Sequence, residues 1–383
     1  MKFTIKRQPF ANQLANILRA VSHTAPIEVL KGIKISCDDS GITLIGSDAE
    51  ISIESFLPVS DPSLDIHIER SGSVVLPARL FNEVVRKLPT DKVSIDVNEA
   101  NAATITSGTA VFVISGVDGD QYPRLPDVNL DHQISLPTIA FKNMITQTLF
   151  ATSNQENRPI LTGVHLIAGE GYIRGVATDS HRLSRRDIPM NFESSEQIFD
   201  DITIPKKTLN ELVRIVGDDQ ELTMTVTDQQ VIFKSENNTI YSRLIEGSYP
   251  ETDRLLPQES STEFVVDAQV FLAAIDRAAL IANESINTTV HLDVSEDKVE
   301  VSVPGNEASF VSENIEYENV SGPQINISFN PDYMKEALNS FGATNIRLKF
   351  KSAVEPIFIV AEEESEIPHN ELLQLLTPIR THY

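Results

Sequence analysis

Short apolar stripes with helical spacing alternate with strand-like segments along the whole chain. Leu80, Phe81, Val84, Val85 and Leu88 recur at the 3.6-residue period that gives a helix one apolar face. Two more stripes have the same spacing: Leu209, Leu212, Val213 and Val216, and Tyr333, Met334, Ala337, Leu338 and Phe341. We expect helices at 9–20, 77–88, 137–151, 205–216, 267–282 and 331–341.

The segments between these helices are rich in β-branched and apolar residues. Val93–Val97, Val111–Ile114, Val299–Val303 and Ile357–Val360 are typical of short strands, and Gly, Asn and Asp separate many such runs. This order predicts an α+β fold, in which two helices per domain pack on one face of an antiparallel sheet.

The chain repeats itself. The segment Leu76–Arg86 resembles Ile204–Arg214, and the pair Tyr122-Pro123 returns as Tyr249-Pro250 at nearly the same offset. A weaker third copy of the first segment runs over Phe329–Leu338. A repeat with a constant offset indicates a duplicated structural unit.

A second repeated segment also indicates that the structural unit is present three times. A short strand followed by a helix begins near Phe3, Ile134 and Phe264, which are almost equally spaced along the chain. We therefore predict three domains, at 1–128, 129–254 and 255–383, with their boundaries in the Pro-rich stretches 122–131 and 249–260, because proline interrupts both helices and strand ladders.

The charge is unevenly distributed over these elements. The 383 residues include 31 Lys and Arg against 55 Asp and Glu, a net charge of −24, which taken alone argues against binding nucleic acid. The six helix windows nevertheless carry +4 together, and the first four are all basic. A single Lys or Arg on a helix is usually only a solvated side chain, but a recurring basic face could follow a phosphate backbone without reading sequence.

Composition narrows the cellular setting. Cys37 is the single cysteine, which excludes a disulfide framework and a thiolate zinc cluster and suggests a reducing compartment. The N-terminus is not signal-like, and no apolar run approaches the ~18 residues that span a membrane. We expect a cytoplasmic protein.

Three groups of residues resemble one known family. They are the repeat plan, the motif Ala177-Thr178-Asp179-Ser180-His181-Arg182-Leu183, and the C-terminal run Leu376–Arg380. Over its whole length the chain is similar to the bacterial sliding clamps, the beta subunits of DNA polymerase III. The resemblance implies a DNA clamp fold of three similar domains and a head-to-tail homodimer that closes into a ring around duplex DNA.

The family's function would then be that of a processivity factor with no cofactor. Its helices would line the hole and meet the phosphates. Candidate DNA-facing residues are Arg79, Arg86, Lys142, Lys206, Lys207, Arg214, Arg277 and Lys335, and a family loop adds Gln155 and Arg158. The first domain departs from the family pattern, since Thr24 stands where Arg is common and Glu28 where Pro is usual.

The resemblance also implies a hydrophobic pocket between the second and third domains. It would take short linear peptides, with Leu and Phe anchors, from the replicative polymerase, the clamp loader and repair proteins. The matching residues are Leu161, Thr178, His181, Arg182, Leu183, Pro250, Arg254, Leu255, Pro378, Ile379 and Arg380. Leu183 or Ile379 alone would be ordinary core, but an apolar C-terminal tail is expected to be docked.

The subunit interface is predicted at a strand edge. Phe112 and Ile114 would meet Leu280 and Ile281 of the third domain of the other copy, since an exposed apolar edge needs a cover. The simpler alternative is that Phe112 and Ile114 are interior.

An enzyme is the competing hypothesis. Asp179, Ser180 and His181 have the composition of a hydrolase site, but consecutive residues cannot converge as nucleophile, base and orienting group. His165 and His181 lack partners at metal-ligand spacing, and no phosphate-binding glycine motif occurs. We therefore expect no catalytic residue, cofactor or metal. A two-domain archaeal or eukaryotic clamp is disfavoured by the three repeats.

Overall fold

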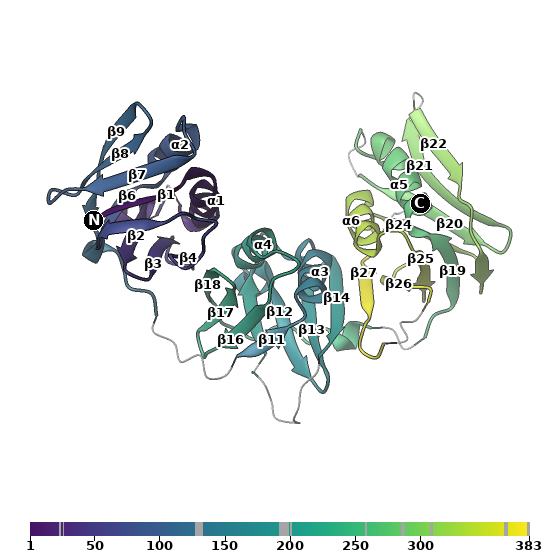
Figure 1. The fold of residues 1–383 in the computed structure, drawn as a ribbon. Coiled ribbons are helices and arrows are strands. Elements are labelled where there is room, and N and C mark those ends of the chain that lie inside the picture. The colour runs from purple at the N-terminus through teal and green to yellow at the C-terminus, as the bar shows by residue number, and fades with distance from the viewer. Residues whose placement is uncertain are drawn as a thin grey trace. The chain divides into compact units, whose positions relative to one another are not determined.

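The computed structural model describes residues 1–22, 24–25, 27–126, 133–190, 199, 201–256, 259–284, 288–306, 309–363 and 367–380. Six α-helices lie in these ranges, each within three residues of a predicted window (Figure 1). They are α1 (Arg7–Ile17), α2 (Ala78–Lys87), α3 (Thr138–Leu149), α4 (Lys206–Ile215), α5 (Ala268–Ala282) and α6 (Pro331–Phe341).

All strand pairings among the described residues are antiparallel, which confirms the α+β prediction. The chain forms two compact units. The first unit comprises Met1–Thr138 and Asn210–Leu244, and the second comprises Ile139–Leu209 and Ile245–Tyr383.

Two sheets build the first unit. The larger has nine strands in the order β10 (Val117–Asp118), β6 (Gly72–Pro77), β2 (Gly32–Asp38), β3 (Gly41–Ser47), β4 (Ile51–Pro58), β18 (Asn238–Arg243), β17 (Gln230–Ser235), β16 (Leu222–Val226) and β11 (Ile134–Leu136). The smaller has the order β5 (His67–Arg70), β1 (Lys2–Lys6), β7 (Lys92–Val97), β8 (Ala102–Ser107) and β9 (Ala110–Ser115).

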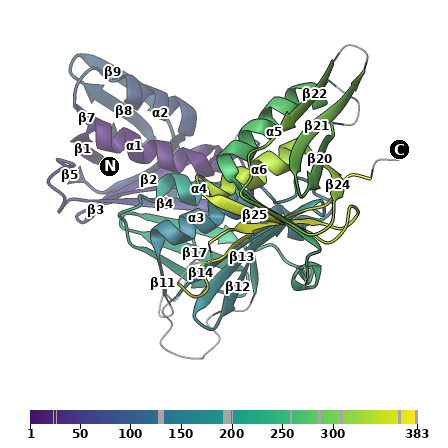
Figure 2. The same cartoon turned by 90° about the vertical axis from the view of Figure 1, so that its right-hand side faces the viewer.

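The second unit has the same plan. Its nine-stranded sheet runs β15 (Ile202–Pro205), β12 (Gly163–Gly169), β13 (Tyr172–Thr178), β14 (Arg182–Pro189), β27 (Leu372–Leu376), β26 (Ile357–Ala361), β25 (Asn345–Phe350), β19 (Thr262–Asp267) and β23 (Asn319–Ser321). Its four-stranded sheet runs β22 (Ser309–Asn314), β21 (Lys298–Asn306), β20 (Val290–Ser295) and β24 (Ile325–Phe329). In this unit α5 and α6 lie side by side (Figure 2).

Aromatic side chains fill the space between helices and sheets. In the first unit the rings of Phe3 and Phe81 each lie 6.1 Å edge-on from Phe10 of α1. In the second unit Phe264 lies 6.0 Å from Phe271 of α5 and 5.9 Å from Phe350. All of these side chains are fully buried, so each helix pair is held by a core of large apolar groups.

Each nine-stranded sheet continues across a predicted domain boundary. In the first unit β4 pairs with β18, with Ile51 opposite Ser242, and in the second β14 pairs with β27, with Arg182 opposite Leu376. The predicted boundary at 128/129 lies outside the described residues. The boundary at 254/255 falls inside the short helix η5 (Asp253–Leu255). Both boundaries stay predictions.

The prediction that Leu80 belongs to the buried face of its helix is wrong. Leu80 is 52% exposed, because it lies on the outward side of α2 while Phe81 and Val85 face the core. Among the described residues, no helix is long and apolar enough to cross a membrane.

Candidate functional sites

Two short turns at the paired strands β4–β18 and β14–β27 organise the surfaces of interest. In the second unit, the turn Asp179–His181 joins β13 to β14 and carries the motif noted in the sequence. Oδ1 of Asp179 accepts hydrogen bonds from the backbone N–H groups of His181 (2.9 Å) and Arg182 (3.1 Å). The hydroxyl of Thr178 accepts one from the N–H of Ser180 (3.2 Å). The turn is therefore rigidly built from its own polar side chains.

An apolar cluster lies beside this turn. Val176, Leu183, Phe358 and Leu375 are buried together, and Tyr249, Leu256 and Leu373 pack against them. A cavity of about 520 Å³ adjoins the cluster through Phe358 and Leu256, and Arg254 and Leu255 also line it. Leu255 is 52% exposed, so it presents an apolar side chain at the mouth of this cavity.

Several predicted pocket residues lie at this cluster or its cavity, and others make different contacts. Leu183, Arg254 and Leu255 line the cluster or its cavity. Leu161 is buried in the short helix η4 (Pro159–Thr162), while Pro250 is exposed. The residues that the sequence reasoning missed are Val176, Leu256, Phe358, Leu373 and Leu375. Four of them alternate along β13, β26 and β27 as in any strand, so only the pairing of those strands brings them together, and Leu256 directly follows η5.

Arg182 is occupied by the protein itself. Its Nε lies 3.0 Å from Oδ2 of Asp179, its Nη2 donates to the carbonyl of Phe150 (2.7 Å), and its Nη1 pairs with Glu336. The guanidinium also lies 4.5 Å from the ring centre of Tyr333. All three nitrogen atoms are engaged, so Arg182 holds the turn against α6 and does not present a free cation.

The C-terminal tail is docked as far as it is described. The backbone N–H and hydroxyl of Thr377 both donate to the carbonyl of His181, at 2.9 and 2.8 Å. The N–H of Ile379 donates to the carbonyl of Ser328 (2.7 Å). Pro378 and Ile379 are half-buried and Arg380 is exposed, so the tail forms one wall beside the turn.

Burial and stacking set the electrostatics of this region. The ring of His165 stacks on Tyr249 at 4.4 Å, and its Nδ1 lies 3.0 Å from the hydroxyl of Thr203. Burial lowers the pKa of His165, although Asp201 at 3.9 Å acts in the opposite direction. Burial likewise raises the pKa of Tyr249. Both groups are therefore neutral at physiological pH and add to an apolar wall.

The cations of α2 are the freest of the predicted DNA-facing set. Arg79 and Arg86 are exposed, and so is the neighbouring Lys87. Within the described ranges none of these three side chains, which we name the α2 cations, forms an ion pair. Arg86 uses only its carbonyl, which accepts from Arg7 at 3.3 Å.

The cations of the later helices have partners. Arg277 of α5 bonds to Glu313 (2.9 Å), and Lys335 of α6 lies 3.0 Å from Asp332 and 3.5 Å from Asp276. These pairs cancel the positive charge locally.

The remaining predicted contacts are on loops and on α3 and α4. Arg158 donates to the hydroxyl of Ser180 (3.2 Å), and Lys206 lies 3.4 Å from Oδ1 of Asn154. Arg214 and Arg19 share Glu211, at 3.4 and 3.0 Å, and Arg19 had not been predicted. Gln155 and Lys207 are exposed, while Lys142 is half-buried.

The predicted subunit edge is an edge in the structure. β9 is the last strand of its sheet, and Val111, Phe112 and Val113 are 61%, 40% and 67% exposed. Ile114 differs, since it is 5% exposed and faces the interior.

A second apolar edge lies in the second unit. Leu280 of α5 is 70% exposed, Ile281 packs partly against the core, and Phe310 of the edge strand β22 is 78% exposed. Phe310 was missed, because an isolated Phe in a polar strand carries no sequence signal for exposure.

Comparison with known proteins decides the family. Three family models match in succession: the N-terminal domain of the DNA polymerase III beta subunit at residues 1–126, its central domain at 135–251 and its C-terminal domain at 253–374. The chain belongs to the beta sliding clamp family. This confirms the predicted fold of three clamp domains, each with two helices on antiparallel sheet.

Full-length relatives agree with this assignment. The chain is 41% identical to the beta sliding clamp of Bacillus subtilis over 386 residues, covering all of both chains, and 39% identical to that of Staphylococcus aureus. The crystal structure of the Bacillus subtilis DNA polymerase sliding clamp superposes with a TM-score of 0.95 at 40% identity over both whole chains. The Streptococcus pneumoniae beta chain gives 0.94 at 34% identity, over 99% of this chain and all of that one.

As a beta sliding clamp, the chain is a processivity factor of DNA polymerase III and not an enzyme. The hydrolase alternative at Asp179 and His181 is therefore wrong. The structure shows what Asp179 does instead, since its carboxylate binds backbone N–H groups and Arg182.

Proposed function

We propose that two copies of this chain close head to tail around duplex DNA in the cytoplasm and hold the replicative polymerase there. The observation that carries the DNA contact is the set of α2 cations, which are unpaired within the described residues of a chain whose net charge is −24. Unpaired cations on a regular helix can meet phosphates loosely and without sequence preference. Acidic surface elsewhere repels DNA and confines it to the basic helices.

The opening of such a ring is wide enough for a duplex. Twelve helices spaced by about 10 Å would lie on a circle about 38 Å across, and removing a helix radius of about 5 Å on each side leaves about 28 Å. A layer of water then fits between protein and DNA, so the contacts are exchangeable and the ring can slide. Retention comes from topology and not from tight binding.

Ring closure would join the two apolar edges. In this arrangement β9 of one copy, with Val111, Phe112 and Val113 exposed, meets the third domain of the other copy at Leu280 and β22. Pairing two strand edges satisfies their backbone groups and buries their apolar side chains together. The contact is heterologous, and it closes because two copies are related by a two-fold rotation.

Partner proteins would dock by short peptides at the cluster around Leu183. The cavity beside it is lined by Leu255, Leu256 and Phe358, which suits a peptide with apolar anchors. The polymerase, the clamp loader and repair proteins would each dock here by such a motif and would therefore compete for this site.

Retention on DNA tests the encircling model. The protein is loaded by a bacterial clamp loader with ATP onto nicked circular DNA, and half of the sample is then linearised. Retention on the circle and loss from the linear form is the expected result. Equal retention on both forms would show ordinary electrostatic binding and would refute the model.

Two variants separate the parts of the proposal. R79E/R86E should lower loading and retention while the dimer persists, because exposed charges are changed. V111D/V113D should give monomers in sedimentation velocity, because two charges enter an apolar edge. R124E/R243E serves as the matched control for charge, since it also reverses two exposed arginines but lies outside the six helices. Dimers of V111D/V113D would contradict the proposed edge.

A further inference from the structure

The first unit contains a copy of the turn that organises the proposed peptide site. The turn Asp48–Glu50 joins β3 to β4, and in the repeat it takes the place that Asp179–His181 takes between β13 and β14. Oδ1 of Asp48 accepts from the N–H groups of Glu50 (3.0 Å) and Ile51 (3.0 Å). The hydroxyl of Ser47 accepts from the N–H of Ala49 (3.1 Å), as that of Thr178 does from Ser180.

The surroundings of the two turns also correspond. The middle residues have nearly the same left-handed backbone, with φ of 78° at Ala49 and 77° at Ser180. The N–H of Arg243 donates to the carbonyl of Glu50 (3.1 Å), where Thr377 donates to His181 in the other unit.

Two further groups complete the correspondence. Leu30 in the short helix η2 (Glu28–Lys31) is buried as Leu161 is in η4. Tyr122 is buried and the corresponding Tyr249 is half-buried, and burial raises the pKa of both phenols. The backbone frame of the proposed peptide site is therefore present twice.

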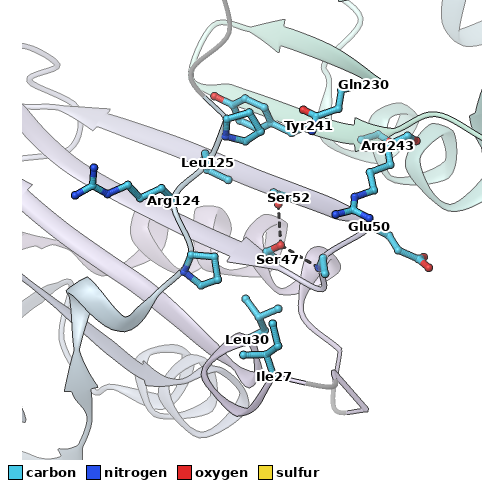
Figure 3. A pocket seen from close by; sticks show the side chains of 14 residues that line it. Ile27, Leu30, Ser47, Glu50, Ser52, Arg124, Leu125, Gln230, Tyr241 and Arg243 are labelled. Atoms are coloured by element: carbon cyan, nitrogen blue, oxygen red, sulfur yellow. Dashed lines mark hydrogen bonds between the residues drawn. The ribbon is translucent and has the colours of Figure 1, made fainter. Parts of the chain in front are cut away.

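A cavity of about 290 Å³ lies beside the first-unit turn (Figure 3). We name it the β4–β18 pocket. It is lined by Ile27, Leu30, Ser47, Ala49, Glu50, Ser52, Pro123, Arg124, Leu125, Pro126, Gln230, Tyr241, Ser242 and Arg243. In the view of Figure 3, Ser47 and Ser52 lie between Arg124 and Arg243. The cavity is at the small end of ligand pockets, about 300–1,000 Å³, so it suits a few residues of a chain.

The lining differs from the second-unit site in charge and polarity. Ser52 and Tyr241 stand where the other site has Leu183 and Leu375, as the strand registers show. Arg124 and Arg243 are both exposed, and within the described residues their guanidinium groups have no ion pair or hydrogen bond. Arg182 and Arg254 of the other site are paired with Asp179 and Glu251.

The lining carries Arg124 and Arg243 against Glu50, so one positive charge remains over, and in a chain of net charge −24 this local excess favours a negatively charged ligand here. The aliphatic side chains of the pocket indicate the chemical class of this ligand. Ile27 is 48% exposed and Leu125 is half-buried, and both line the same pocket as the arginines. A sugar-phosphate backbone has no aliphatic groups that would pack against these side chains. A peptide that alternates carboxylate and aliphatic side chains can bind both the arginines and the aliphatic residues of the pocket.

We propose that the β4–β18 pocket is a second peptide-docking site, selective for short acidic segments with an aliphatic anchor. The carboxylates would pair with Arg124 and Arg243, and the anchor would lie against Ile27, Leu30 and Leu125. This inference extends the proposed function, because the peptide role of the second-unit site is itself proposed. A partner with two different motifs could then hold one clamp chain at two places.

Methyl-labelled NMR spectra of the full-length protein test the inference at both sites separately. The first probe is acetyl-Glu-Leu-Asp-Leu-Asp-amide, and its control is the isosteric amide peptide acetyl-Gln-Leu-Asn-Leu-Asn-amide. The second probe, acetyl-Gly-Leu-Ser-Leu-Phe-amide, reports on the second-unit site through Leu255 and Ile379. We expect the acidic probe to shift the methyl signals of Ile27, Leu30 and Leu125, with the amide control at least about tenfold weaker.

Two variants test whether the two sites are independent. R124E/R243E should abolish the shifts at Ile27 and Leu125 and leave binding at Leu255 unchanged. R254E should leave the Ile27 signals unchanged. Both variants replace exposed side chains, so folding is preserved and is checked by the unperturbed methyl spectrum.

Each remaining outcome has one meaning. No shift at Ile27, Leu30 or Leu125 up to about 1 mM acidic peptide, with normal shifts at Leu255, would overturn the second site and leave the proposed function standing. Shifts at Ile27 without any at Leu255 would support the second site and refute the proposed peptide role of the second-unit site. Shifts at Ile27 from a ten-residue oligothymidine but not from the acidic peptide would assign the pocket to nucleic acid and overturn the inference.

Discussion

The turns Asp48–Glu50 and Asp179–His181 have one backbone design and two different surroundings. In both, an aspartate accepts two backbone N–H groups and a hydroxyl accepts a third. Around the second turn, Leu183 and Leu375 form an apolar cluster and Arg182 is buried in ion pairs. Around the first, Ser52 and Tyr241 occupy the corresponding positions beside unpaired arginines. The comparison teaches that the duplicated unit conserves backbone hydrogen bonds while its side chains set the ligand chemistry of each copy.

The largest expected difference between the turns comes from their aspartates. Asp179→Ala removes the side-chain acceptor of two backbone N–H groups and one of the two ion pairs of Arg182, whose side chain is 10% exposed. Losing the hydrogen bond between the two charged groups adds about 1.5–3 kcal/mol to the loss of the turn contacts. Asp48→Ala removes the side-chain acceptor of the N–H groups of Glu50 and Ile51 and should cost about 1 kcal/mol. Hydrogen exchange of the amides of Leu183 and Ser52, which follow the two turns in β14 and β4 and do not donate to the aspartates, measures the two opening free energies.

The control for this pair is Glu336→Gln. It weakens the other ion pair of Arg182 and leaves the turn hydrogen bonds intact. It should therefore lie between wild type and Asp179→Ala. Equal opening free energies for Asp179→Ala and Asp48→Ala would show that Arg182 contributes nothing to the second turn.

The apolar cluster gives the next largest contrast. Leu183→Ala removes a side chain that is 1% exposed and should cost about 2–3 kcal/mol of local stability in β14, because the cluster cannot fully collapse into the space. Ser52→Ala, at the corresponding position of β4, loses one hydrogen bond to Ser47 and should cost about 0.5–1 kcal/mol. Hydrogen exchange along β14 and β4 compares them. A cost of Ser52→Ala as large as that of Leu183→Ala would mean that both turns rest on equivalent cores.

Lowering the pH should destabilise the second turn, Asp179–His181, and leave the stability of the first turn, Asp48–Glu50, unchanged. The pKa of His165 is lowered by burial, so the folded protein binds fewer protons there than the unfolded chain does. Its stabilising contribution is complete above the unfolded value of 6.5 and is lost as the pH falls through and below that value. The first repeat has Lys34 at the position that corresponds to His165, so the first turn lacks this histidine.

Hydrogen exchange between about pH 7.5 and about pH 5.5, corrected for the intrinsic rates, tests this. Protection near Tyr249 should fall with pH, while protection near Tyr122 should not. His165→Gln should remove most of the pH dependence. Parallel losses of protection at both tyrosines would point to a global effect and refute a role for His165.

The smallest expected effect is one that the two turns share. Ala49 and Ser180 are held at positive φ, where a Cβ costs about 1–2 kcal/mol that glycine avoids. Glycine also loses more chain entropy on folding, about 0.5–1 kcal/mol. Ala49→Gly and Ser180→Gly should therefore each change the opening free energy by less than about 1 kcal/mol, and by similar amounts. Unequal changes measured by exchange would show that the backbone frames are not equivalent.

The helices and the repeat could be predicted because their signals are local. An apolar stripe such as Phe81 and Val85 depends on residues within two turns, and each predicted window lies within three residues of a helix. The burial of Leu80 was predicted wrongly, because the width of the buried face of a helix depends on the elements that pack against it. The candidate pocket was found through a motif whose residues are consecutive, and its missing members, such as Phe358 and Leu375, lie on strands far along the chain.

The amino-acid order alone was enough for the three repeats, the six helices and the paired Tyr-Pro positions, because each is a pattern within one segment or between copies of it. The amino-acid order could not show which Lys and Arg side chains lack an ion-pair partner. Arg277 meets Glu313, and Arg19 meets Glu211 at a separation of 192 residues, while the α2 cations and the arginines of the β4–β18 pocket have no ion-pair partner among the described residues. Charge pairing and strand pairing join residues that are distant in sequence, so they exist only once the chain has closed those loops.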